Sequence, residues 1–221
     1  MNLFRRTTLI AACGGAVLLA PGGAALAAAP TPHQLSITAP SKIVFGKTAT
    51  VSGKLTGSDA AGEDVTLLSD PFPFASFQPE ASTQTGPAGG YAFVVAPTVN
   101  TKYMTRAKSK APAESAEVLV KVAPKITLRV SDKTPAAGQK VKFSGTVAPE
   151  HDGQAVLLQR RKSDGTWRTM QTVLLVDAGA APSTYSATRT INRGGRWRVV
   201  KRADADHARG QSPVRVLTLE S

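Results

Sequence analysis

The chain contains an internal repeat of about 90 residues. The segment 46–55, GKTATVSGKL, reappears at 138–147 as GQKVKFSGTV, 92 residues further along the chain. Three aromatic pairs keep nearly the same spacing: Phe77 and Trp167, Tyr91 and Tyr185, Tyr103 and Trp197. This period is too long for one unit of a solenoid or propeller and fits a small domain with its own core. The repeat therefore predicts two tandem domains of the same architecture.

Between its turn residues, the chain alternates apolar and polar side chains with a period of two. Examples are the segments 49–52, 118–122 and 126–130. This alternation is typical of strands with one buried face, and the 15 prolines and 19 glycines of the chain interrupt it as turns do. After residue 27, no segment keeps a helical apolar stripe for three turns. We therefore expect an all-β fold, with about seven strands in each repeat.

Residues 1–27 have the features of a signal peptide. Arg5 and Arg6 precede an apolar run over 9–26, and Ala25-Leu26-Ala27 supplies the small residues that signal peptidase requires. Cleavage after Ala27 would release a secreted chain. A retained membrane anchor is the alternative, but glycines and a proline interrupt the run and no basic stop-transfer segment follows it.

Cys13 is the only cysteine, so cleavage after Ala27 leaves a mature chain without any. This excludes disulfides, thiol nucleophiles and cysteine-ligated metals from the mature protein. The segment 10–13 has the composition of a lipobox, in which a lipidated Cys13 would tether the protein to a membrane. Only three residues separate Arg6 from this segment, however, which is too short for the usual apolar core of a signal.

The repeat also sets the expected domain limits. Residues 28–34 form a small-residue arm that we predict to be disordered, the first domain covers 35–122, and the second covers 126–219. The linker 123–125 contains a proline and is too short to let the domains fold back on one another. This geometry is typical of a spacer.

Four segments of the second repeat carry a resemblance to a known family. They are GQAVLLQRR at 153–161, DGTW at 164–167, TYS at 184–186 and GRWRV at 195–199. The pattern resembles the bacterial immunoglobulin-like repeat found in secreted and surface proteins of high-GC Gram-positive bacteria. The resemblance implies two immunoglobulin-like β-sandwiches and a location outside the cell or at its envelope. It implies no catalytic residue.

The first repeat departs from this pattern at 68–74, where Phe72 and Phe74 alternate with prolines. One interpretation is a partner-binding loop, as in an accessory or inhibitor protein that binds an extracellular enzyme. The other is that both rings cover the sandwich edge, and we favour it because aromatic side chains are usually buried. Phe77, aligned with Trp167, is expected in the core.

Basic residues are concentrated in the second repeat. Residues 28–123 contain 8 basic and 7 acidic side chains, whereas residues 124–221 contain 17 and 8. An imbalance in one of two similar domains favours an anionic envelope polymer as partner, although outward-facing arginines can also be merely solvated. The candidate binding residues lie on a predicted hairpin and a later strand: Arg160, Arg161, Lys162, Arg168, Arg196 and Arg198.

The sequence contains no recognised catalytic motif. The segments 150–153 and 204–207 each combine a histidine with carboxylates, but neither has the spacing of a calcium loop, and both are interpreted as polar turns. We therefore predict no enzyme activity, no cofactor and no metal.

Together these features predict an exported binding or spacer protein of the cell envelope. Its partner would be an anionic polymer or another extracellular protein, with no specific nucleic acid, and with membrane attachment only through a lipidated Cys13. A carbohydrate-binding module is a further alternative, in which Trp167, Trp197 and Tyr185 would line one exposed face. Their correspondence with aromatic residues of the first repeat argues instead for core positions.

Overall fold

The computed structural model describes residues 32–108, 112–179 and 182–220. The predicted signal peptide, Cys13 and residues 28–31 of the arm lie outside these ranges. The described residues form strands, turns and loops without a helix, which confirms the all-β prediction. None of them belongs to a helix able to span a membrane.

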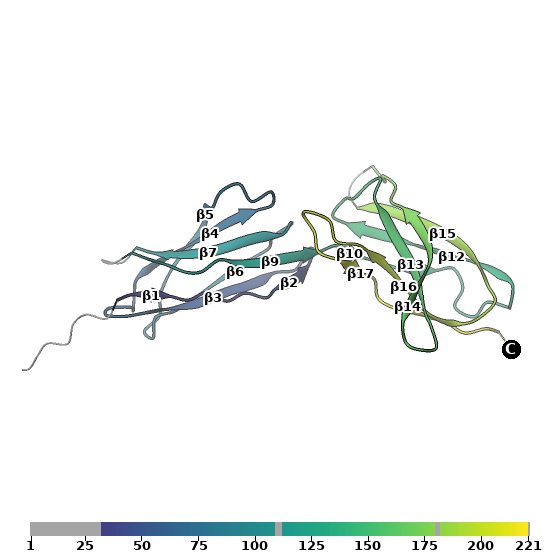
Figure 1. Cartoon of the computed structure of the whole chain (residues 1–221), viewed down its shortest axis with the longest axis horizontal. Coiled ribbons are helices and arrows are strands. Elements are labelled where there is room, and N and C mark those ends of the chain that lie inside the picture. The colour runs from purple at the N-terminus through teal and green to yellow at the C-terminus, as the bar shows by residue number, and fades with distance from the viewer. Residues whose placement is uncertain (1–31, 109–111, 180–181, 221) are drawn as a thin grey trace, which may run out of the picture. The chain divides into compact units, whose positions relative to one another are not determined.

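Strands β1–β9 pair with one another and make up what we call the N-terminal half (Figure 1). One sheet has the order β1-β3-β6, and the other has the order β2-β9-β7-β4-β5 with β8 beside β7. The strands are β1 (Gln34–Leu35), β2 (Lys42–Val44), β3 (Ala49–Thr56), β4 (Asp64–Pro71), β5 (Gln78–Gln84), β6 (Gly90–Val95), β7 (Thr101–Ala107), β8 (Ala113–Glu114) and β9 (Val118–Ala123).

Strands β10–β18 likewise pair with one another, and they make up what we call the C-terminal half. Its smaller sheet has the order β10-β12-β11 with β15 beside β12, and its five-stranded sheet has the order β14-β13-β16-β17 with β18 beside β16. The strands are β10 (Lys125–Ile126), β11 (Arg129–Val130), β12 (Gln139–Ala148), β13 (Ala155–Arg161), β14 (Trp167–Leu174), β15 (Ser183–Ile191), β16 (Gly195–Lys201), β17 (Gly210–Gln211) and β18 (Arg215–Leu217).

Each half has one hydrophobic core, to which strands of both its sheets contribute. In the N-terminal half, Val51 and Phe93 come from the smaller sheet and Tyr103 from the larger. In the C-terminal half, Phe143 and Trp197 come from different sheets and their ring centroids lie 4.8 Å apart. This packing explains why apolar and polar residues alternate along the strands, because one face of each sheet is buried against the other sheet.

A glycine–tyrosine contact occurs at equivalent places in both halves. Gly53 lies opposite Tyr91 in the β3–β6 pair, and Gly145 lies opposite Tyr185 in the β12–β15 pair. Each tyrosine crosses its glycine and donates a hydrogen bond to a backbone carbonyl, Tyr91 to Ser36 O and Tyr185 to Thr127 O. Only a residue without a side chain leaves room for the ring at this position.

The larger sheets of the two halves share a β-bulge. The register shifts between Leu67 and Leu68 in the β4–β5 pair, and between Leu158 and Gln159 in the β13–β14 pair. These positions are 91 residues apart, close to the spacing of the sequence repeat.

One expectation is wrong: Phe77 and Trp167 are not core residues. Phe77 precedes β5, and the bulge explains the position of Trp167. Both are partly exposed and belong to neither core. In β14, Val173 faces the core, and a period of two would place Trp167 on the same face. The extra residue in the bulge inverts this alternation, so that Trp167 instead lies opposite Arg161 on the outer face. Tyr91, Tyr103, Tyr185 and Trp197 are buried, as predicted.

Strand boundaries differ slightly from the expected domain limits. Gln34, expected in the arm, pairs with Thr56 in β1. Ala123 ends β9 and Lys125 begins β10, so that only Pro124 separates these strands. Each half has nine short strands rather than about seven, because several edge strands of two or three residues complete the sheets.

Candidate functional site

Charge is distributed very differently over the larger sheets of the two halves. The six-stranded sheet of the N-terminal half carries both signs: Asp64, Asp70, Glu80 and Glu114 against Lys42, Lys102, Arg106 and Lys121. The five strands of the other sheet contain no Asp or Glu, and their basic residues are Arg160, Arg161, Arg168, Arg196, Arg198, Lys201 and Arg215. The strands of the smaller sheet of this half likewise contain no Asp or Glu and carry Lys125, Arg129, Lys140, Lys142 and Arg189, so the positive charge of the second repeat is spread over both sheets.

The predicted basic residues do not form one surface. Neighbouring residues of a strand point to opposite faces, so Arg160 and Arg161 separate. Arg160 lies opposite Arg168 on β14 and opposite the buried Trp197 on β16, which places it on the inner face. Arg161, Arg196 and Arg198 belong to the outer face. Lys162 lies beyond the end of β13, and its ammonium forms an ion pair of 2.9 Å with Asp164.

On the outer face, Arg198 is held in a fixed position. Its guanidinium lies over the ring of Trp167, 4.0 Å from the centroid, and donates to the side-chain oxygens of Gln159 and Gln211. A guanidinium carries five N–H groups, so Arg198 keeps donors that these two contacts do not use. The outer face is therefore positively charged, and Arg198 presents its remaining donors there in a fixed position.

The inner-face arginines border a pocket at one end of the core. The pocket has a volume of about 200 Å³ and is open to solvent. We call it the arginine pocket; its lining is Arg160, Met170, Arg189, Thr190, Ile191, Asn192, Arg193 and Trp197. In the described part of the chain, none of its three arginines forms an ion pair with a carboxylate.

Two buried donors of the pocket residues also lack a hydrogen-bond partner. They are Nε1 of Trp197 and Nε of Arg189, and no described residue accepts from either. Another nitrogen of Arg189 donates to Met170 O over 2.8 Å, which anchors the side chain beside the pocket. An unpaired buried donor costs roughly 1–3 kcal/mol, and because both atoms are closed off from solvent, an acceptor in the pocket would reach them only after the side chains move. The three arginines around this solvent-open hollow suit an oxyanion.

Phe72 and Phe74 form a compact pair in the connection between β4 and β5. Their ring centroids are 5.7 Å apart in an edge-to-face arrangement, and Lys102 Nζ lies 5.4 Å from the Phe74 centroid. Both rings are partly buried. They cover one another and the start of β7 rather than projecting as an apolar surface, which favours the covering role over a partner-binding loop.

The aromatic residues of the carbohydrate-binding alternative do not share a face. Tyr185 and Trp197 lie in the core, and only Trp167 is partly exposed. The exposed platform that this alternative requires is therefore missing from the described C-terminal half.

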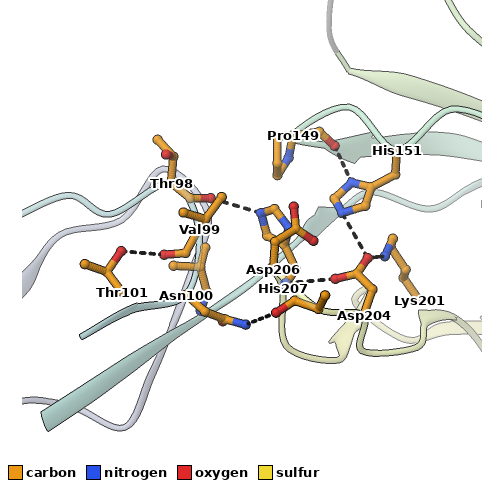
Figure 2. Close-up of polar contacts among 12 residues, drawn as sticks. Thr98, Val99, Asn100, Thr101, Pro149, His151, Lys201, Asp204, Asp206 and His207 are labelled. Carbon is orange, nitrogen blue, oxygen red and sulfur yellow. Dashed lines mark hydrogen bonds and ion pairs between the residues drawn. The ribbon is translucent and has the colours of Figure 1, made fainter. Parts of the chain in front are cut away.

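A second cluster brings together two turns that the sequence keeps far apart. His151 lies between β12 and β13, whereas Asp204 and His207 lie in the loop between β16 and β17 (Figure 2). The imidazole centroids of the two histidines are 4.8 Å apart, and both side chains are almost completely buried. His151 Nε2 lies 3.7 Å from Asp204 Oδ2.

Backbone carbonyls determine which ring nitrogen of each histidine carries a proton. A carbonyl oxygen only accepts, so His151 Nδ1 donates to Pro149 O over 2.8 Å and His207 Nε2 donates to Thr98 O over 2.9 Å. In the neutral rings, the remaining nitrogens, His151 Nε2 and His207 Nδ1, then present lone pairs. Both are buried, and no described group forms a hydrogen bond with either.

Lys201 and Asp204 supply the charge of this cluster. The buried ammonium of Lys201 forms an ion pair with Asp204 Oδ2, and the backbone N–H of His207 donates to Oδ1 over 2.8 Å. Burial acts to raise the pKa of Asp204, but these hydrogen bonds outweigh it and lower the pKa to about 2. Burial lowers the pKa of His151 below its usual 6.5, which favours the neutral ring.

Sequence reasoning identified Arg160 as a binding residue but did not bring it together with Arg189 and Arg193, and it did not bring the two histidine-containing turns together. It interpreted 150–153 and 204–207 as separate polar turns, and it grouped the arginines by hairpin rather than by face. One usable signal was present: Lys201 is a charged residue at a position where strand alternation expects an inward side chain, as for Val199. A buried lysine requires a partner, and Asp204 is three residues away.

The chain matches no protein-family model and no curated protein sequence.

Proposed function

We propose that this chain is an exported protein of the cell envelope in which two tandem immunoglobulin-like β-sandwiches carry a binding site for an anionic polymer. The binding site is the arginine pocket of the C-terminal half, and the N-terminal half acts as a spacer. The role is one of binding, without catalysis. The shared glycine–tyrosine contacts and β-bulges support the tandem architecture.

The observation that carries the binding role is the arginine pocket itself. Arg160, Arg189 and Arg193 lie around a solvent-open hollow, and none of the three has a carboxylate partner among the described residues. Guanidinium groups bind phosphate and carboxylate oxygens through paired N–H donors. The pocket would hold one oxyanion of the polymer, and the outer-face arginines would attract its neighbouring charges.

The binding role predicts a specific effect of pocket charge. With linear polyphosphate and polygalacturonate as probes, binding of the mature chain should weaken steeply between 50 and 200 mM NaCl, because each neutralised anionic group releases a counterion (roughly one per contact). The double variant Arg160→Gln/Arg193→Gln should bind at least about tenfold more weakly. Isothermal titration calorimetry at both salt concentrations measures the effect.

A matched control separates the pocket from general charge. Arg161→Gln/Arg196→Gln removes the same charge from exposed positions on the outer face and should change affinity by no more than about threefold. Equal losses in the two variants would show that diffuse charge alone binds the polymer. If neither probe binds at low salt, only the spacer role remains.

The export proposal predicts the mature N-terminus. Cleavage after Ala27 should give a secreted chain that begins at Ala28, because Ala25 and Ala27 occupy the positions that signal peptidase reads. N-terminal sequencing of the secreted protein measures this directly. A chain beginning at a lipid-modified Cys13 would contradict it and would place the protein on a membrane.

A further inference from the structure

We propose that His151, Asp204 and His207 bind a divalent transition-metal ion, with Zn²⁺ the best match. The ligand atoms of these three residues already lie within 4.8 Å of one another. Nitrogen and oxygen ligands at about 2.0–2.1 Å from a tetrahedral zinc ion are about 3.3 Å apart. Small rotations of the three side chains would therefore close the site around an ion.

The hydrogen bonds around the two imidazoles are those of metal ligands. A metal-binding histidine usually donates its second ring N–H to a carbonyl or carboxylate, which orients the ring and leaves the other nitrogen free to coordinate. His151 and His207 do this with Pro149 O and Thr98 O. Their remaining nitrogens are buried and have no hydrogen-bond partner among the described residues, and that of His151 lies 3.7 Å from Asp204 Oδ2.

Electrostatics allows a cation here but limits its affinity. Asp204 contributes one negative charge, and Asp206 adds a second at the edge, with its Oδ1 3.1 Å from His207 Nδ1 but outside hydrogen-bond geometry. Lys201 opposes them, since its ammonium shares Asp204 Oδ2 with the ion. A carboxylate oxygen has more than one lone pair and can serve both. Asp204 is 23% exposed, which opens a path from solvent.

The ligand set selects the class of ion. Two imidazoles and a carboxylate suit zinc and its transition-metal neighbours, whereas Ca²⁺ and Mg²⁺ prefer sites made of oxygen. Three protein ligands leave a fourth position on the ion for water or for a group from another molecule. The proposed site is separate from the arginine pocket and does not depend on the polymer-binding role.

Titration of the metal-free mature chain with Zn²⁺ tests the proposal. We expect one ion per chain, together with a higher melting temperature in the presence of zinc, because the ion binds the folded state. His151→Ala and His207→Ala should each weaken binding by at least about a hundredfold, since each removes one of three ligands. The matched control is His33→Ala, which changes the one remaining histidine and lies outside the cluster.

Lys201→Met tests the proposal through an expected gain in zinc affinity, whereas a misfolded variant would lose affinity. Methionine keeps an apolar side chain of similar length at this buried position and removes the competing ammonium from Asp204. The variant should bind zinc at least about tenfold more tightly, because a repelling charge in contact with the site is gone. Co²⁺ bound to the same variant should show the visible absorption of a tetrahedral ion.

Three results would overturn the proposal. They are the absence of zinc binding by the wild-type chain, equal binding by folded His151→Ala and wild-type protein, and unchanged affinity in Lys201→Met. Far-UV circular dichroism verifies that the histidine variants fold. If they do not, the wild-type titration and the lysine variant decide the question.

Discussion

Replacing Trp197 by alanine is expected to destabilise the C-terminal half by about 3–5 kcal/mol. The indole is 2% exposed and packs against Phe143 in the core. Removing it leaves a large cavity that the strands of two sheets cannot close, because each is held in register by its neighbours. Urea unfolding followed by tryptophan fluorescence measures the loss, with Trp167 as the remaining reporter.

Trp167 is the matched control for this prediction. It is the only other tryptophan, it belongs to the same sheet, and its contact with Arg198 lies on the outer face. Trp167→Ala should cost about 1 kcal/mol, the energy of a partly exposed cation–π contact. Equal losses in the two variants, or a loss below about 1 kcal/mol for Trp197→Ala, would place Trp197 outside the core.

Replacing Gly53 by alanine is expected to cost about 3 kcal/mol or more in the N-terminal half. A methyl group at this position would overlap both Ser36 O and the Tyr91 hydroxyl. The chain would have to move β1 or Tyr91, and the tyrosine would lose its hydrogen bonds to Ser36 and Thr105. Overpacking and the loss of a buried hydrogen bond act together here.

Gly90→Ala is the control, because Gly90 lies opposite Lys54, the neighbour of Gly53, and has open space around it. It should change stability by less than about 1 kcal/mol, and it can even stabilise the protein by restricting the unfolded chain. Far-UV circular dichroism follows both halves, whereas both tryptophans report on the C-terminal half alone. A Gly53→Ala variant as stable as Gly90→Ala would contradict the close packing of Tyr91.

The metal and polymer proposals fail independently. Lys201 and the histidines lie where β16 meets the β16–β17 loop. The arginine pocket is lined by Trp197 of β16, by the end of β15 and by the two residues that follow β15. A chain that binds zinc but no polymer would support the metal proposal alone. A chain that binds polymer but no zinc would support the polymer proposal alone.

Periodic and repeated features could be predicted from the sequence. Alternation with a period of two identified the strands, because side chains of a strand point alternately to its two faces. The repeat identified Tyr91, Tyr103, Tyr185 and Trp197 as core residues, since two domains of the same architecture bury the same positions. Charge counting assigned the positive charge to the second repeat.

Only the tertiary structure shows on which face of a sheet each side chain lies. A single extra residue in β14 inverts the alternation and moves Trp167 to the outer face, and no local pattern in the sequence marks it. The same alternation separates Arg160 from Arg161, so that residues adjacent in the chain belong to different surfaces. Arg189 and Arg193 join Arg160 only because β15 ends beside the five-stranded sheet.

The sequence by itself determined an all-β chain with a strong positive charge in its second repeat, because strand alternation and composition are local properties. The histidine cluster was decided by the tertiary structure alone. His151 and His207 are separated by four strands, β13 to β16, and they meet because the sheet pairing returns β16 to the side of β13. Nothing in either turn specifies that contact, since it depends on the register between strands and not on the residues of the turns.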